Sequence, residues 1–213
     1  MLKNDNLEAQ LAGIYHSFFD DPENSADGTI SDLGEVVGGA TPSTDNPNYF
    51  SDDGIAWISP KDLTATGLKF IYRGELCITD AAYNSCSTKI MPAGTVLFTS
   101  RAPVGTVAIA MNDICTNQGF KSVIPRQEIG TAFVYFFLKE SKQLIESHAS
   151  GTTFMEVSGN VMKNIPAIIP KPNLAKQFSS LCGPVFEVQK QNELEISRLE
   201  DLRQTVISSI SSR

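Results

Sequence analysis

The stretch NLAKQFSSLCGPVFEVQKQNELEISRLEDLRQTVISSI, residues 173–210, decides the fold of this 213-residue chain. Its apolar residues first recur at spacings of 4, 3, 4 and 3, which is the heptad pattern of a coiled-coil helix: Leu174, Phe178, Leu181, Val185 and Val188. The pattern weakens at Asn192 and Glu195 and resumes at Ile196, Leu199, Val206 and Ile210. The spacing predicts one helix over 174–211, about 57 Å long, with a shift of register after Val185 and a kink at Gly183-Pro184.

A helix of this length needs a partner helix, because one small domain cannot cover its whole apolar stripe. One candidate is the N-terminal stretch, where a second helical stripe ends before Asp20-Asp21-Pro22: Leu7, Leu11, Ile14 and Phe18. The other candidate is a second copy of the chain, which would use the same stripe twice. The residues predicted to contact the partner helix are Leu181, Val185, Val188, Ile196, Leu199, Val206 and Ile210.

The middle of the chain differs from both helical ends. Short apolar runs of strand length recur there between Gly, Pro, Asn and Asp: Ile55–Ile58, Leu68–Tyr72, Thr95–Thr99, Thr106–Met111, Lys121–Ile124 and Ile165–Ile169. Residues Thr131–Ser147 have helical spacing and predict one helix. We therefore expect an α+β protein: a short helix and linker over 1–28, a mixed, β-rich domain with a few helices over 29–171, and a long coiled-coil spacer helix over 172–213.

Composition excludes several classes of protein. The longest apolar run, Ala132–Leu138, is seven residues, whereas a membrane span needs about 20. The first residues, MLKNDNLEAQ, are polar and do not resemble a secretory signal. The four cysteines are scattered without a Cys-x-x-Cys pair, as expected for reduced thiols in a cytoplasmic protein without a structural metal.

The charge is unevenly distributed. The formal net charge is −7, and residues 1–40 account for all of it, with one basic and eight acidic residues. This charge argues against a protein that coats nucleic acid by charge alone, but it does not exclude a neutral domain with one basic face.

Catalytic signals are weak. Asn46-Pro47-Asn48-Tyr49 resembles the loop that holds the target base in amino-group DNA methyltransferases, but Asn48 replaces a proline, and no Gly-rich cofactor turn occurs. An ordinary Asn-Pro turn is the better interpretation. Neither His16 nor His148 belongs to a recognisable catalytic motif, and no phosphate-binding loop occurs. The sequence therefore favours a protein that is not an enzyme.

Three polar loops are candidates for contacts with double-stranded DNA: residues 38–44, 99–105 and 150–154. Hydroxyls, arginine and glycine backbone suit phosphate groups, while Asn117 and Gln118 could read adenine and Arg101 guanine. From these residues alone, ordinary turns and caps are the favoured interpretation. The candidate DNA-binding residues are Thr41, Ser43, Lys61, Lys89, Ser100, Arg101, Asn117, Gln118, Lys121 and Thr152.

The order of several motifs resembles the specificity subunit of type I restriction–modification systems. These motifs are Gly38-Gly39-Ala40-Thr41-Pro42-Ser43, Ile55-Ala56-Trp57-Ile58 with Asp62-Leu63, Pro92-Ala93-Gly94-Thr95-Val96-Leu97, Ser100-Arg101-Ala102-Pro103-Val104-Gly105, Ser150-Gly151-Thr152-Thr153 and Ile165-Pro166. The long heptad helix looks like that family's spacer helix. Each motif is weak alone, but their order and spacing make the resemblance specific from about residue 7 to residue 211.

The resemblance implies a non-catalytic subunit that reads DNA and carries no cofactor. It would recruit a DNA methyltransferase subunit, which binds S-adenosylmethionine, and a restriction subunit, which is an ATP-dependent translocase and nuclease. A full-length member has two recognition domains and reads a two-part site, whereas this chain resembles one half. It would then pair with a second copy or with a different half, or be a fragment. A free-standing DNA-binding protein and a coiled-coil adaptor are the alternatives.

Overall fold

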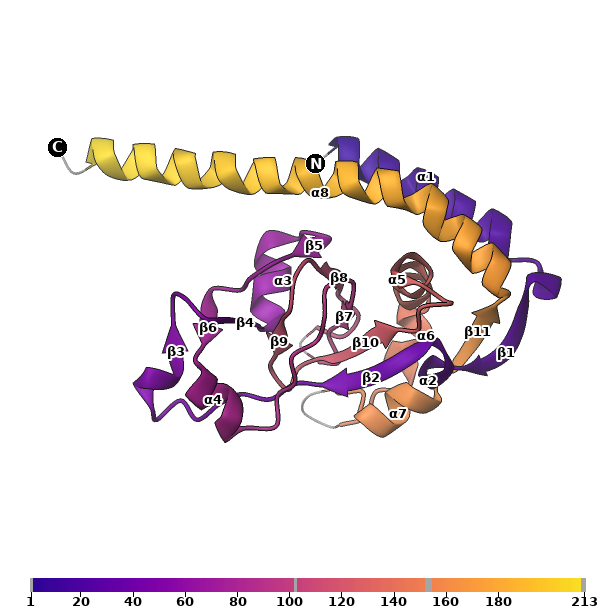
Figure 1. Ribbon diagram of the computed structural model, residues 1–213, viewed down its shortest axis with the longest axis horizontal. Coiled ribbons are helices and arrows are strands. Elements are labelled where there is room, and N and C mark those ends of the chain that lie inside the picture. Colours follow the sequence, from indigo (N-terminus) through magenta and orange to yellow (C-terminus); the bar gives the residue numbers. More distant parts are fainter. Residues whose placement is uncertain (1, 102, 152–154, 212–213) are drawn as a thin grey trace.

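The computed structural model of the chain describes residues 2–101, 103–151 and 155–211 (Figure 1). The helices are α1 (Leu2–Phe19), α2 (Ile30–Leu33), α3 (Pro60–Thr66), α4 (Asp80–Ser85), α5 (Thr131–Glu140), α6 (Lys142–Ser147), α7 (Gly159–Asn164) and α8 (Pro172–Ser211), with short 3-10 turns η1 (Pro22–Asn24) and η2 (Pro47–Tyr49). The strands are β1 (Ser25–Thr29), β2 (Gly34–Gly38), β3 (Phe50–Ser51), β4 (Ile55–Ile58), β5 (Phe70–Ile71), β6 (Leu76–Ile78), β7 (Val96–Phe98), β8 (Val107–Ala110), β9 (Cys115–Thr116), β10 (Lys121–Pro125) and β11 (Pro166–Pro170).

The strands form three sheets, and the expected α+β class is confirmed. A five-stranded sheet has the order β2-β10-β7-β8-β5, a four-stranded sheet has the order β3-β6-β4-β9, and β1 pairs with β11. Both larger sheets are mixed, because β5–β8 and β4–β9 are parallel pairs while the other pairs are antiparallel. Each of the six predicted apolar runs overlaps one strand, namely β4, β5, β7, β8, β10 or β11.

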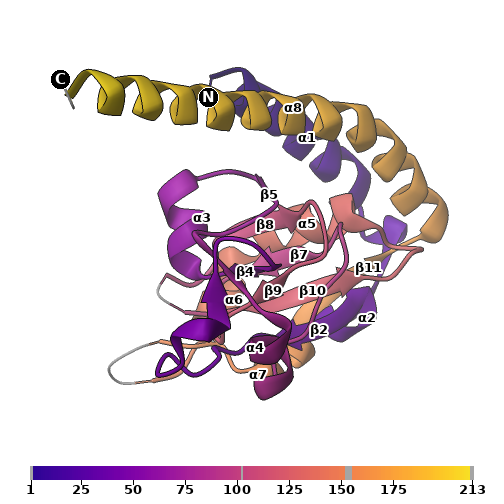
Figure 2. The ribbon, with the colours of Figure 1, turned by 60° about the vertical axis from the view of Figure 1, so that its left-hand side comes forward.

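Strands β1 and β11 bring the two ends of the β-rich part together. Ser25 pairs with Pro170 and Thr29 with Pro166, so the chain enters and leaves this part side by side. As a result α1 and α8 run along each other above the sheets, and the free end of α8 extends past the rest of the molecule (Figures 1 and 2).

The single helix predicted over Thr131–Ser147 is wrong in one respect, because the structure divides it into α5 and α6 at Ser141. All residues from Ala132 to Leu138 are buried. Helix α5 lies between α8 on one side and strands β7, β8 and β10 on the other, so both of its faces are covered (Figure 1). The seven-residue apolar run therefore marks a core helix and not a strand.

An aromatic cluster joins the helices to the sheets. Phe178 of α8 is fully buried, and its ring centroid lies 5.4 Å from that of Phe19 in α1 and 5.8 Å from that of Phe136 in α5. Tyr15 of α1 stacks on Phe136 with the ring centroids 5.8 Å apart. This cluster is the centre of the main hydrophobic core.

Helix α8 is continuous from Pro172 to Ser211, slightly longer than the predicted 174–211, with Pro184 inside it. The face that packs on α1 and the sheets carries Phe178, Cys182, Gln189 and Glu193, which are all buried. The predicted partner contacts fall mostly on another face: Leu181, Val188, Leu199, Val206 and Ile210 are exposed, while Val185 and Ile196 are half-buried. Helix α1 therefore covers a different stripe of α8 from the predicted one.

Candidate nucleic-acid interface

The loop that follows β2 is pressed against the turn that follows β9. The N–H of Ala40 donates to the carbonyl oxygen of Thr116 at 3.0 Å, and the Trp57 indole donates to the carbonyl oxygen of Ala40 at 3.1 Å. A Cβ on Gly39 would lie only 2.1 Å from the same Thr116 oxygen. Glycine is therefore required at position 39, because any side chain would force these two backbones apart.

This close approach brings two predicted DNA-binding residues together. The Thr41 hydroxyl donates to the side-chain oxygen of Gln118. The neighbouring Asn117 turns its side-chain oxygen back to the N–H of Gly119 at 2.8 Å, which shapes the turn. Gln118 therefore lies at the exposed tip of this turn. Because its side-chain oxygen accepts from Thr41, the orientation of its side-chain amide is set by this contact.

A second group of predicted residues gathers at the start of β10. The Lys121 ammonium lies 3.3 Å from the Gln118 carbonyl oxygen, 3.4 Å from the Ser100 hydroxyl and 3.3 Å from a carboxylate oxygen of Glu156. The other carboxylate oxygen of Glu156 lies 3.6 Å from the guanidinium of Arg101. We call Ser100, Arg101, Gln118, Lys121 and Glu156 the cationic cluster.

The cationic cluster has one carboxylate for two cations, so it keeps a local charge of +1. The Lys121 side chain is 13% exposed and the Arg101 side chain 32%, which places the lysine beneath the arginine. Ser100 is fully buried and its backbone is bonded to Gly119 and Val157. Ser100 therefore supports the cluster from below, and its hydroxyl does not reach the surface as the predicted DNA contact would require.

Glu156 is the functional candidate that the sequence did not reveal. Its backbone pairs with that of Ser150 through two hydrogen bonds of 2.9 and 3.0 Å. No spacing pattern in the sequence marks this residue, because its partners Arg101 and Lys121 lie 55 and 35 positions away. The only hint was the polar stretch at 150–154, which lies two residues before Glu156 in the sequence.

The remaining candidates lie elsewhere or outside the described residues. Lys61 is exposed and pairs with Glu75 at 2.7 Å, and Lys89 is exposed and pairs with Glu35 at 3.5 Å. Ser43 forms a turn with Asp45. Thr152 lies outside the described residues. The structure thus brings Thr41, Ser100, Arg101, Asn117, Gln118 and Lys121 together, while Lys61, Lys89 and Ser43 make separate contacts.

The described residues contain no group of three or more His, Cys, Asp or Glu side chains that could hold a metal ion. The four cysteines are free thiols, and burial raises the pKa of Cys115 to about 11. Among the helices of the described ranges, none is long and apolar enough to cross a membrane.

The fold defines a class of protein: a mixed α+β module mounted on a long helix. Two solved structures share this fold. One belongs to a study of complex assembly and conformational transition of the type I R-M system, with a TM-score of 0.60, 17% identity, 93% of this chain covered and 50% of the other. The other is the HsdS subunit from Thermoanaerobacter tengcongensis, with a TM-score of 0.59, 16% identity, and 93% and 49% covered.

Residues 22–195 match the model of the type I restriction modification DNA specificity domain, and the chain belongs to this family. It is 39% identical over 171 residues to the MjaIX specificity subunit of Methanocaldococcus jannaschii, covering 78% of this chain and 39% of that protein. It is 29% identical over 194 residues to the EcoR124I/EcoR124II specificity subunit of Escherichia coli, covering 84% and 47%. The resemblance noted in the sequence is confirmed, and the chain spans less than half the length of these curated relatives.

Proposed function

We propose that this chain is a non-catalytic DNA-recognition subunit of a type I restriction–modification complex and reads one half of a two-part DNA site. The cationic cluster supports this best. It places an arginine, a lysine and an amide side chain at one surface point where three loops meet. The Arg101 guanidinium suits the two acceptors of guanine, and the Gln118 amide suits adenine. Lys121, which lies beneath Arg101, adds positive charge that would attract phosphate.

The same proposal divides the work along the chain. Residues 29–171 would bind DNA, and residues 172–213 would hold the complex together, with 1–28 as an N-terminal helix and linker. A DNA methyltransferase subunit would bring S-adenosylmethionine, and a restriction subunit would bring ATP, so this chain needs no cofactor of its own. The complex would work in the cytoplasm, where its DNA is.

Replacing Arg101 with alanine is expected to change or abolish sequence recognition without unfolding the chain. One bidentate contact to guanine provides about 1–3 kcal/mol of discrimination, which is roughly a tenfold to hundredfold effect. The measurement is co-expression with the methyltransferase subunit encoded beside the chain, followed by sequencing that detects modified bases. Arg126→Ala is the matched control, because Arg126 is exposed just beyond the opposite end of β10.

Two results would contradict this role. Unchanged methylation specificity and rate in Arg101→Ala would exclude Arg101 as a contact. Failure of the unaltered chain to form any complex with the methyltransferase would exclude the proposed function as a whole.

The exposed stripe of α8 supports pairing with a second copy of the chain. Its apolar side chains remain uncovered after α1 has packed, with exposed fractions that reach 68% at Ile210. Antiparallel pairing about a two-fold axis between Glu193 and Leu194 would match Leu181 with Val206, Val185 with Leu202, and Val188 with Leu199 of the second copy. A patch of this length is of the size that marks interaction surfaces.

Cross-linking tests this pairing directly. In a Cys86→Ser background, the double variant Val188→Cys, Leu199→Cys is expected to form a covalent dimer on a non-reducing gel, because the two positions face each other across the axis. The control pair Leu181→Cys, Leu199→Cys is one heptad out of register, about 10 Å apart along the helix, and too distant for a disulfide. Equal cross-linking of both pairs, or a monomer in light scattering, would contradict antiparallel self-pairing. A dimer only with a different half would indicate a mixed pair.

A further inference from the structure

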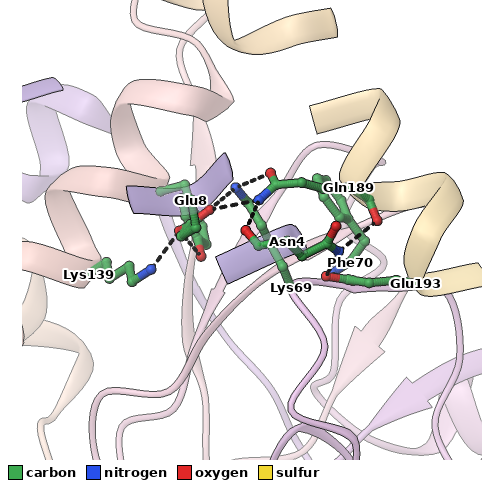
Figure 3. Close-up of polar contacts among 8 residues, drawn as sticks. Asn4, Glu8, Lys69, Phe70, Lys139, Gln189 and Glu193 are labelled. Atoms are coloured by element: carbon green, nitrogen blue, oxygen red, sulfur yellow. Dashed lines mark hydrogen bonds and ion pairs between the residues drawn. The ribbon is translucent and has the colours of Figure 1, made fainter. Parts of the chain in front are cut away.

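We call residues 29–171, which are proposed to bind DNA, the DNA-reading part. A buried lysine lies where this part meets helices α1 and α8 (Figure 3). Lys69 immediately precedes β5, the edge strand of the five-stranded sheet, and is only 8% exposed. Its ammonium donates to the Glu8 carboxylate of α1 at 2.7 Å and to the Gln189 side-chain oxygen of α8 at 3.0 Å. One charged group at the edge of the sheet thus contacts both α1 and α8.

Aromatic rings enclose the rest of this ammonium. It lies 3.7 Å from the ring centroid of Phe186 in α8 and 4.3 Å from that of Tyr135 in α5. The Glu8 carboxylate is fully used, because it also accepts from the Tyr135 hydroxyl at 2.9 Å and from the Lys139 ammonium at 2.5 Å. Burial raises the pKa of Glu8, but the two ammonium groups outweigh it and lower that pKa to about 2. Burial lowers the pKa of Lys69 to about 8 despite the attraction of Glu8.

Phe70, which follows Lys69, contacts the next turn of α8. The N–H of Phe70 donates to the Glu193 carboxylate at 2.9 Å. Gln189 and Glu193 are one helical turn apart, so Lys69 and Phe70 form hydrogen bonds with two successive turns of α8 (Figure 3). Sliding or rotating the helix would leave a buried charge without its partner, which is strongly unfavourable.

Core packing alone does not require a lysine here. Replacing a buried ion pair with apolar groups of similar size is often neutral or stabilising, whereas a charge with several exact partners restricts the packing to one arrangement. A single packing arrangement of α8 is important because the helix extends far beyond its contacts with Lys69 and Phe70. The part of α8 beyond Glu193 is about 27 Å long, so a tilt of about 10° moves its end by about 5 Å, more than one base-pair rise of about 3.4 Å.

We propose that Lys69 is a positioning residue that sets the direction of α8 relative to the DNA-reading part, and thereby the separation of the two half-sites on DNA. This inference rests on the proposed function and adds a determinant of spacing to it. The cationic cluster would determine the base sequence of each half-site. The contacts of Lys69 with α1 and α8 would determine the number of base pairs between the half-sites.

The first test uses the full chain with its methyltransferase subunit and DNA in which the spacer between half-sites is lengthened or shortened by one base pair. We expect the unaltered chain to prefer one spacer by about tenfold or more, and Lys69→Met to reduce this preference to about threefold or less while the half-site sequences stay the same. Lys142→Met is the control, because Lys142 is an exposed lysine of α6.

The double variant Lys69→Met, Glu8→Gln separates positioning from stability. It removes both members of the buried Lys69–Glu8 pair, and the Lys139 ammonium that loses Glu8 is 41% exposed to water. Its thermal midpoint is therefore expected to return toward that of the unaltered chain while the spacer preference stays relaxed. If Lys69 only stabilised the fold, the spacer preference would recover together with the thermal midpoint. Retention of the full spacer preference in the double variant would overturn the proposal.

A second measurement does not depend on methylation. Spin labels on Glu128→Cys and Gln204→Cys, in a Cys86→Ser background diluted with unlabelled chain, report the distance between the DNA-reading part and the far half of α8. The unaltered chain is expected to have one narrow distance distribution, and Lys69→Met a distribution several ångströms broader. An equally narrow distribution in Lys69→Met would overturn the positioning role, whereas absent methylation with a broadened distribution would point to failure of the proposed function.

Discussion

Replacing Phe178 with alanine is expected to lower the free energy of unfolding by about 3–5 kcal/mol, the largest loss of any single substitution discussed for this chain. The ring is fully buried, and it contacts aromatic residues of α1 and α5 at once. Alanine would leave a cavity where aromatic residues of α1, α5 and α8 meet. Denaturant unfolding followed by near-ultraviolet circular dichroism measures the effect.

A graded series strengthens this prediction. Phe178→Leu keeps most of the volume and should cost less than about 1.5 kcal/mol. Tyr72→Ala removes an aromatic ring that is 44% exposed and should change stability by no more than about 0.5 kcal/mol. A loss in Phe178→Ala no greater than that in Tyr72→Ala would show that the aromatic cluster does not hold α8 in place.

Gly39→Ala is the second substitution with a large expected effect. The new Cβ would lie 2.1 Å from the Thr116 oxygen and 2.3 Å from the Asn117 oxygen, both of which belong to the backbone. The loop must therefore move, and the Thr41–Gln118 contact breaks with it. We expect a loss of about 3 kcal/mol, the upper end of the usual cost of overpacking, together with loss of sequence-specific methylation.

The adjacent glycine is a close control for this prediction. A Cβ on Gly38 would first meet the Lys121 side chain at 3.8 Å, an ordinary van der Waals contact. Gly38→Ala should therefore keep both stability and methylation within a small factor of the unaltered chain. Similar behaviour of the two variants in denaturant unfolding would contradict the requirement for glycine at position 39.

Local spacing was sufficient for much of the secondary structure. The heptad pattern predicted α8 to within two residues at its start, and the short apolar runs predicted six strands. The helical spacing over Thr131–Ser147 also predicted a helix there, but not the break at Ser141 that divides α5 from α6. The buried residues of α5 are covered on both faces, so they lack the polar side from which the end of a helical period can be recognised.

The sequence was sufficient to predict which loop residues could contribute to the candidate interface, but not how these residues are arranged in space. Thr41, Arg101, Gln118 and Lys121 were named from the sequence, and the structure brings them together. Glu156 was not named, because an isolated glutamate in a polar loop carries no signal until the folded chain sets it beside two cations. Lys61 and Lys89 had the right chemistry, but each pairs with a glutamate elsewhere.

The long helix, the β-rich middle and the family could be predicted from the sequence, because each depends on residues close together in the chain or on motifs in a set order. Three features depend on the packing of the folded chain: which stripe of α8 is covered, that Glu156 lies beside two cations, and that Lys69 is buried. Lys69 meets Glu8 across 61 positions and Gln189 across 120. Contacts over such separations arise when β1 and β11 close the β-rich part and set α1 beside α8, and no local period encodes that packing.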